Sequence, residues 1–314
     1  MHAFKFARPG TGTPRLFGTS ARRIVSTLLV LCVCMLAQRA VAATLVAMTY
    51  NIHHAEGTDD VIDIQRITDV INTYNPDVVS LQEVFQGTDL LSNPFFQLDD
   101  LATLTGMQGY FGAAFTVPPG EPVIGDFGNA VLVKSDITIN NATTHALPNP
   151  EPAAPSEPRS VIEMQLSLDD MGTPVDFTFL ATHFDHNSVA NRLAQAAFVN
   201  DLVDGSSTPA ILAGDLNASP GSSVMQVIED EWTNTSLSIP QIDYVMYRGS
   251  NQWNVILPGQ HLIDPTTSVA SDHFPVLATV EIVPEPSSLA LALLALIGGS
   301  AFLRHRRRGW ANGA

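Results

Sequence analysis

TYNIHH at positions 49–54 is the stretch that decides the fold, together with THFDH at 182–186 and GDLN at 214–217. Each of the three lies at the end of an apolar run, at 45–52, 175–182 and 210–213, and each run predicts a buried strand. Polar side chains therefore lie at the ends of the predicted strands, where a rigid scaffold commonly positions binding and catalytic residues.

The chain between residues 44 and 283 continues in the same way. Further strands are expected at 78–81, 129–134, 161–168, 242–247 and 274–282, and amphipathic helices at 62–74 and 189–203. Five prolines between 148 and 158 predict a loop. Many strands with helices between them indicate one layered α/β domain.

The polar residues at the strand ends are of few chemical kinds. Carboxylates, carboxamides and histidines predominate: Asn51, His53, Glu83, His183, Asp185, Asp215, Asn217, Asp243, Asp272 and His273, with Arg159 before the strand at 161–168. Oxygen donors without cysteine suit Mg²⁺, Mn²⁺ or Ca²⁺. Zinc would require more histidine or thiolate ligands. The pattern predicts a site for a divalent cation.

Eight short motifs in a fixed order carry a resemblance to a known family. In chain order they are TYNIHH, LQEV (81–84), GNAVL (128–132), PRS (158–160), THFDH, GDLN, IDYV (242–245) and SDH (271–273). This set resembles the endonuclease/exonuclease/phosphatase superfamily over nearly all of 44–283. Its members include type I deoxyribonucleases, abasic-site endonucleases, neutral sphingomyelinases and inositol-phosphate 5-phosphatases. The resemblance implies a layered α/β fold with two packed, mostly antiparallel β-sheets flanked by helices in a four-layer sandwich.

The resemblance also implies roles for the residues that would hold the cation and the attacking water. Glu83 is expected to be the main metal ligand, with Asn51 beside it and Asp272 at a second position. The cofactor would be Mg²⁺, or Mn²⁺ or Ca²⁺. Asp215 would orient or deprotonate the water, and Asn217 would donate a hydrogen bond to the transition state.

A second group is expected to contact the phosphate. His273 would do so with its ring oriented by Asp243, and His183 would act on the opposite side as a hydrogen-bond donor or a general acid. Arg159 and Asn129 would bind phosphate oxygens. For His53 and His54 two interpretations stay open, a wall of the site or a solvated loop.

The two ends of the chain do not fit the domain pattern. Residues 1–43 carry six Lys/Arg and no acid, an apolar run at 24–37, and small residues at Ala40, Ala42 and Ala43. They predict a signal peptide removed by signal peptidase, with a buried N-terminal helix as the alternative.

At the other end, residues 284–314 hold Pro-Glu-Pro, an apolar run at 289–303 and an arginine cluster at 304–308. This resembles the PEP-CTERM sorting tail of Gram-negative bacteria. The resemblance implies a membrane helix before processing by an exosortase-type protease, and a plain anchor is the alternative. Both alternatives place the domain outside the cytoplasm, at the cell surface, outer membrane or extracellular matrix.

Charge and cysteine content limit the possible functions. Residues 44–283 contain five Lys/Arg and 30 Asp/Glu, a net charge of −25. Such a domain has few cations to spread along a nucleic-acid backbone, and its high charge favours a soluble monomer. Both cysteines, Cys32 and Cys34, lie in the predicted signal peptide, so no disulfide is expected in the mature domain.

Three functions remain after these observations. The first is a metal-dependent phosphodiesterase or phosphatase that acts on a small or lipid-borne phosphate ester outside the cell. The second is an extracellular nuclease with the same catalytic residues, and the third is a non-catalytic matrix protein. The segments 85–96 and 114–127 are expected to shape the substrate face, and neither has the aromatic and basic residues of a single-strand nucleic-acid groove.

Overall fold

The computed structural model describes residues 43–89, 94–117, 123–153, 155–170, 173–236, 242–249 and 252–283. All described helices and strands lie within one compact unit, residues 42–284, which contains both sheets and every described hydrophobic cluster. The predicted sorting tail and, apart from Ala43, the predicted signal peptide lie outside the described residues. Among the described residues, no helix is long and apolar enough to cross a bilayer.

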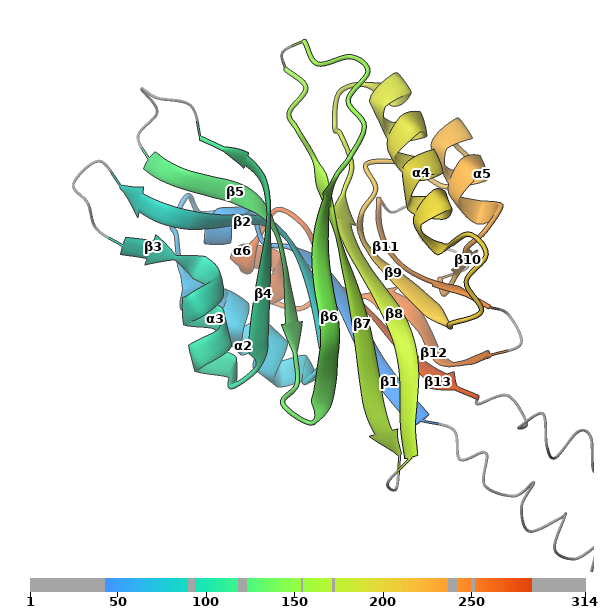
Figure 1. The fold of residues 1–314 in the computed structure, drawn as a ribbon. Helices are drawn as coiled ribbons and strands as arrows, with labels where there is room; N and C mark the ends of the chain where they lie inside the picture. The colour runs from blue at the N-terminus through green and yellow to red at the C-terminus, as the bar shows by residue number, and fades with distance from the viewer. Residues whose placement is uncertain are drawn as a thin grey trace, which may run out of the picture. The chain divides into compact units, whose positions relative to one another are not determined.

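The first sheet contains seven strands and both ends of the unit (Figure 1). Its order is β12 (Trp253–His261), β13 (Val276–Ile282), β1 (Ala43–Asn51), β2 (Val78–Asp89), β5 (Val123–Val133) and β4 (Gln108–Thr116), and β3 (Pro94–Phe96) pairs with β2. Within it only β1 and β2 are parallel.

The second sheet contains six strands. Its order is β10 (Thr233–Asn234), β11 (Asp243–Arg248), β9 (Ala210–Asp215), β8 (Thr173–His183), β7 (Ser160–Asp170) and β6 (Ile137–Ala146). Its one parallel pair is β8 with β9. Both sheets are therefore mostly antiparallel, as the resemblance implied.

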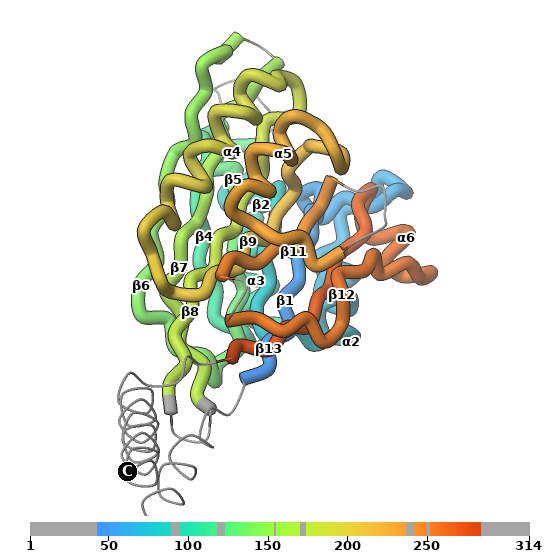
Figure 2. Tube along the Cα trace, turned by 90° about the vertical axis from the view of Figure 1, so that its right-hand side faces the viewer, coloured from blue at the N-terminus to red at the C-terminus, as the bar shows by residue number. Residues whose placement is uncertain are grey.

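Helices cover the outer face of each sheet (Figures 1 and 2). The first sheet packs against α2 (Ile64–Tyr74) and α3 (Gln97–Thr105), with the short α6 (Thr267–Ala270) and the 3-10 turn η1 (His53–Ala55) nearby. The second packs against α4 (Val189–Val203) and α5 (Ser223–Glu229). The result is a helix–sheet–sheet–helix sandwich, which confirms the predicted fold class.

Side-chain alternation along the strands builds the core between the sheets. Leu45 and Ala47 of β1 point into it, while Met48 packs with α2 and α3 on the other face. Ile211 and Ala213 of β9 meet them from the second sheet. Burial on both faces explains why these strands appear in the sequence as nearly continuous apolar runs.

The structure contains several elements that the sequence patterns did not predict: α3, α5, β4, β6 and β12. Three of them, β4, β6 and β12, lie at sheet edges. An edge strand has less buried surface, so its sequence holds polar residues such as the Thr and Asn of 137–146. The predicted strand at 78–81 is also longer than expected and continues to Asp89.

Candidate active site

The ends of four strands bring polar side chains into the space between the sheets. Asn51 of β1, His183 of β8, Asp215 of β9 and Asp243 of β11 each share a strand face with inter-sheet core residues, and all four are buried. His183 lies beside Asp215 in the parallel pair, and Asp243 lies directly opposite Asp215 in the antiparallel pair. Strict two-residue alternation thus places apolar residues in the core and polar residues at its end.

Glu83 reaches the same space because β2 contains a bulge. The register with β5 shifts between Leu81 and Val84, and both of these residues pack on the helix side. Glu83 has φ of 59°, so the chain turns and its side chain leaves the helix-covered face. Its Oε1 accepts a hydrogen bond of 3.0 Å from Nδ2 of Asn51, and the same nitrogen lies 3.3 Å from Oδ2 of Asp215.

Glu83, His183 and Asp215 line one open cleft of about 850 Å³. Phe115, Val117 and Phe127 form an apolar part of its wall, with the two phenyl rings 5.6 Å apart. The polar lining comprises His54, Glu83, Ser156, Glu157, Arg159, His183, His186, Asp215, Asn217 and His273. The segment 114–127 therefore contributes to the cleft, as expected for a substrate face.

Asp215, Asp243 and His273 form a charge-coupled group. Nδ1 of His273 lies 2.9 Å from Oδ2 of Asp243, and its Nε2 lies 3.8 Å from Oδ2 of Asp215. Burial, followed by repulsion from Asp243, raises the pKa of Asp215 to about 7, against weaker opposing effects of His273, Asn217 and Asn51. Burial alone would lower the pKa of His273, but the hydrogen bond and charge of Asp243, with the charges of Asp215 and Asp272, raise it to about 9.

The opposite side of the cleft has two histidines held by one arginine. Nη1 of Arg159 lies 3.3 Å from Nδ1 of His183, and Nη2 lies 3.0 Å from Nδ1 of His186. A guanidinium can only donate, so Nδ1 of His183 accepts and its Nε2 carries the proton. Burial, then the charge of Arg159, lowers the pKa of His183 well below its ordinary value. His183 is therefore a neutral hydrogen-bond donor at neutral pH, which favours the donor role over that of a general acid.

Two hydrogen-bond donors, Nδ2 of Asn217 and Nε2 of His183, lie close together in this part of the cleft. Nδ2 of Asn217 lies 3.1 Å from Nε2 of His183 and also 3.1 Å from the carbonyl oxygen of Phe184. Oδ2 of Asp215 is 3.6 Å from Nε2 of His183, beyond hydrogen-bond distance. Within the described residues, the Nε2–H of His183 therefore has no good acceptor. An anionic oxygen placed between the two donors would supply one.

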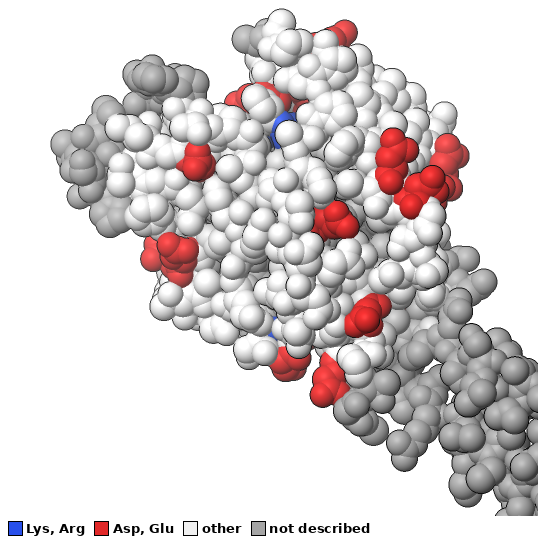
Figure 3. All heavy atoms as spheres, in the orientation of Figure 1, with Lys and Arg blue, Asp and Glu red and all other residues white. Residues whose placement is uncertain are grey.

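Charge is distributed unevenly over the unit. On the face in Figure 3, acidic side chains are scattered and almost no lysine or arginine is exposed. Arg159 is 5% exposed and is the one lysine or arginine among the described residues that line the cleft. Its Nε is buried without a hydrogen-bond partner in the described part of the chain. Arg159 also pairs with Glu157 of the same lining, whose Oε2 lies 3.2 Å from Nη2.

The donor set fits a divalent cation. Glu83 is half-buried beside Asn51. Asp272 is outside the cleft lining, with a side chain 56% exposed and Oδ1 3.9 Å from Nδ1 of His53. Oδ1 of Asn51 accepts from the N–H of His53, so the amide nitrogen rather than the oxygen faces Glu83. A half-turn of the amide would present Oδ1 to a cation and release that backbone hydrogen bond.

Six residues predicted for the site line this cleft: Glu83, Arg159, His183, Asp215, Asn217 and His273. Asn51 and Asp243 do not line it but contact Glu83 and His273, and Asp272 and Asn129 lie outside the lining. Asn129 is buried and its Nδ2 donates to the backbone oxygen of Ser160, 2.8 Å away, so it supports the chain next to Arg159 and does not line the cleft. Sequence reasoning assigned no role to His186, although it closes the THFDH motif. It also did not distinguish Phe115 and Phe127 within their segment, because one sequence has no signal for which aromatic residue faces a cleft.

Comparisons with known proteins agree with this geometry. Residues 48–273 match the sequence model of the Endonuclease/Exonuclease/phosphatase family, and residues 283–308 match that of the PEP-CTERM protein-sorting motif. No match was found among curated proteins.

Solved structures with the same fold include an endonuclease/exonuclease/phosphatase from Beutenbergia cavernae DSM 12333, with TM-score 0.61 and 26% identity over 76% of this chain and 72% of that one. The mannosyl-6-phosphatase of Bacteroides thetaiotaomicron has TM-score 0.56 and 21% identity over 76% of this chain and 100% of that one. The human Nocturnin catalytic domain with bound sulfate has TM-score 0.58 and 21% identity over 77% of this chain and 96% of that one.

Proposed function

Because the chain belongs to the endonuclease/exonuclease/phosphatase family, we propose that it is an exported, divalent-metal-dependent phosphoric ester hydrolase. The observation that carries the proposal is the meeting of Asp215, Asn217, His183 and the His273–Asp243 pair at one cleft. Fold alone does not determine reaction type, but this set offers a base, anion donors and a cation site within one space.

Each side chain has a role that follows from its protonation state. Asp215 accepts the proton of the attacking water, since a pKa of about 7 suits proton uptake near neutral pH. His273, with a pKa of about 9, is cationic at neutral pH and donates from Nε2 to the phosphate, while Asp243 holds Nδ1. Neutral His183 and Asn217 donate from the other side.

The remaining functional residues bind charge. Glu83, with Asn51 and Asp272, would hold the divalent cation, which when bound polarises a phosphate oxygen and stabilises the leaving group. Arg159 orients His183 and His186 and supplies the one cationic side chain on that wall. Together these groups would stabilise the negative charge that develops on the phosphate in the transition state.

The acidic surface supports a substrate with few phosphates. Within 44–283 the net charge is −25, and the single arginine in the cleft is nearly buried. Long nucleic acids would meet repulsion outside the cleft, whereas a small or lipid-borne ester brings only one or a few phosphates to the cleft that Arg159 lines. The neighbour with the mannosyl-6-phosphatase name makes a sugar phosphate one candidate. An extracellular nuclease with the same catalytic residues is the second candidate.

Export follows from the match of residues 283–308 to the sorting motif. We infer that the N-terminal 43 residues act as a signal peptide and that an exosortase-type protease processes the tail. The domain would then act at the surface of a Gram-negative cell or in its matrix.

The test uses residues 42–284, the compact unit that contains both sheets. Turnover of bis-p-nitrophenyl phosphate, a sugar phosphate, a choline phospholipid and plasmid DNA is measured with Mg²⁺, Mn²⁺, Ca²⁺ or EDTA. Asp215→Asn and His273→Gln are compared with Asp201→Asn and His145→Gln, matched changes outside the cleft lining. Cation-dependent turnover that only the first two variants lose supports the hydrolase, and plasmid as the best substrate favours the nuclease. No turnover from folded protein with any cation indicates a non-catalytic matrix protein.

A further inference from the structure

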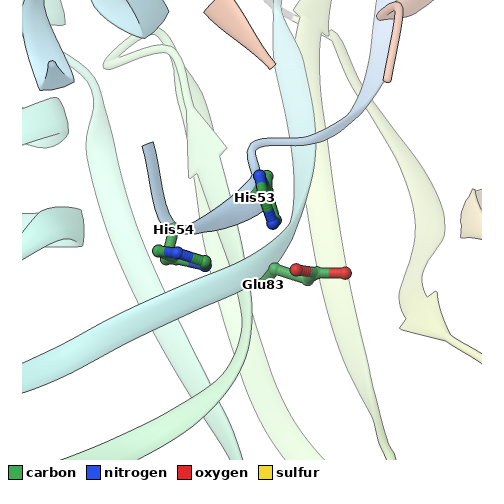
Figure 4. A group of neighbouring side chains, drawn as sticks. All are labelled: His53, His54 and Glu83. Atoms are coloured by element: carbon green, nitrogen blue, oxygen red, sulfur yellow. The ribbon is translucent and has the colours of Figure 1, made fainter. Parts of the chain in front are cut away.

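Two histidines that follow β1, His53 and His54, lie beside Glu83, and His54 also lines the cleft (Figure 4). One ring nitrogen of His53, one of His54 and one carboxylate oxygen of Glu83 all lie within 4.8 Å of one another. The centroids of the two rings are 4.5 Å apart. Neighbouring donors on one cation stand roughly 3–3.4 Å apart, since each metal–nitrogen bond is about 2.1 Å. Side-chain rotations that bring the three atoms closer together are therefore needed for all of them to reach one cation.

An uncommon backbone conformation creates this arrangement. His53, His54 and Ala55 have φ of 45°, 43° and 62°, and Glu83 opposite them has φ of 59°. Left-handed conformations are uncommon for non-glycine residues and persist where the surrounding structure imposes them. The left-handed turn directs two successive rings toward Glu83, whereas successive side chains of a strand would point to opposite faces.

Glu56 orients both rings. Its carbonyl oxygen lies 3.3 Å from Nδ1 of His53, and its Oε2 lies 2.9 Å from Nε2 of His54. Both partners are acceptors, so each of these nitrogens donates its N–H. Nε2 of His53 and Nδ1 of His54 make no hydrogen bond within the described residues and are the ring atoms left for a metal ion. A ring that donates one N–H to an oxygen and offers its other nitrogen is the usual arrangement of a metal-ligating histidine.

The two rings are not packed as core side chains. The side chains of His53 and His54 are 36% and 31% exposed, and neither residue belongs to a hydrophobic cluster. Solvent exposure leaves room for water or substrate oxygens to complete a coordination sphere.

We propose that His53, His54 and Glu83 form a cation site that takes a first-row transition ion, such as Mn²⁺ or Zn²⁺, in preference to Mg²⁺. Imidazole nitrogen suits Zn²⁺ and other late first-row ions best and binds Mn²⁺ more weakly, whereas Mg²⁺ favours oxygen donors. The site extends the oxygen donor set expected from the sequence by two nitrogen ligands. It rests on the proposed function in one respect, that Glu83 is also the main ligand of the hydrolytic cation.

Binding of Mn²⁺ to the metal-free unit of residues 42–284 tests the site. Pulsed electron paramagnetic resonance detects ¹⁴N nuclei that are bonded to Mn²⁺, and we expect such couplings in the wild type. They should disappear in the double variant His53→Gln, His54→Gln. Calorimetry should show Mn²⁺ affinity about 10- to 100-fold lower in that variant and in Glu56→Gln, with a much smaller loss of Mg²⁺ affinity. His145→Gln, which alters a histidine paired with Glu163, should change neither.

Bound Mn²⁺ without ¹⁴N couplings in the wild type would overturn the proposal, and this result does not depend on whether any variant folds. Couplings that persist in the double variant would overturn it too, because His183 or His273 would then be the source. The two proposals can be refuted independently. ¹⁴N couplings without turnover would refute the hydrolase and leave the histidine site in place. Cation-dependent turnover without couplings would refute the histidine site and leave the hydrolase in place.

Discussion

Replacing Asp215 by asparagine is expected to stabilise the protein and at the same time to lower its activity strongly. Asparagine has nearly the same shape, and its Oδ1 can still accept the 2.8 Å hydrogen bond from the N–H of Asn217. The change removes a carboxylate that is 1% exposed and lies opposite Asp243. Loss of a general base should lower kcat by about 10²- to 10⁴-fold.

The size of the stability change follows from the pKa of Asp215, which rises from 3.8 to about 7 on folding. As pH rises, the carboxyl group of Asp215 is deprotonated in the unfolded chain at a lower pH than in the folded protein. The free energy of unfolding therefore falls as pH rises from 3.8 to about 7. Above about pH 7 this loss of stability is complete. Each pH unit is worth about 1.4 kcal/mol, which sets an upper limit of about 4 kcal/mol. The charge of Asp215 also supports protonated His273, so a net gain of roughly 2–4 kcal/mol is expected for the variant at pH 8.

Urea unfolding in EDTA, from pH 4 to pH 8.5, measures this through the fluorescence of Trp232 and Trp253, both buried. The free energies of unfolding of wild type and variant should nearly coincide at pH 4 and separate as pH rises. Parallel curves, or a variant that is less stable at pH 8, would refute the reasoning. Parallel curves would mean that the pKa of Asp215 does not rise on folding, and a less stable variant would mean that the folded protein stabilises the carboxylate.

Three further changes test the surrounding contacts. Arg159→Lys should lower kcat/KM for bis-p-nitrophenyl phosphate about 100-fold, because one ammonium group cannot replace a planar guanidinium that holds two imidazole rings. Near-normal kinetics would show that Arg159 is not needed to orient the two histidines. Asp243→Asn should lower the pKa of His273 from about 9, as followed by NMR titration of the ring proton, and an unchanged pKa would show that another group holds the charge. Since that pKa is raised, the stability contributed by the His273–Asp243 pair is complete below pH 6.5 and is lost as pH rises through about 9. Gly214→Ala should destabilise by about 1–3 kcal/mol in urea unfolding, because its Cβ would overlap the carbonyl oxygen of Thr182 in the adjacent parallel strand, and a negligible change would show that the strands can separate.

The fold could be predicted where strands are buried on both faces. The runs at 45–52 and 210–213 correspond to β1 and β9, which lie inside their sheets, and their composition reflects that burial. The edge strands β4, β6 and β12 have no such pattern, because solvent on one side tolerates polar residues. The motifs therefore indicated the family while leaving the sheet edges undefined.

The site was predictable to a similar extent. The ends of buried strands identified Asp215, His183 and Asp243, and alternation places all three between the sheets. For Glu83 the motif identified the residue, but its direction depends on a bulge against β5 that no local pattern indicates. His53 and His54 stayed undecided, since their approach to Glu83 depends on a left-handed turn.

The sequence by itself determined the chemistry available to this protein: a strongly acidic domain, a sparse set of cations, and oxygen and imidazole donors at strand ends. Only the tertiary structure decided which atoms face one another. It placed Asp243 opposite Asp215, Arg159 against two histidines, and His53 and His54 beside Glu83. The physical reason is that periodicity determines the face of a strand on which a side chain lies. Protonation states and metal ligands depend instead on contacts between strands and loops that are distant in the sequence.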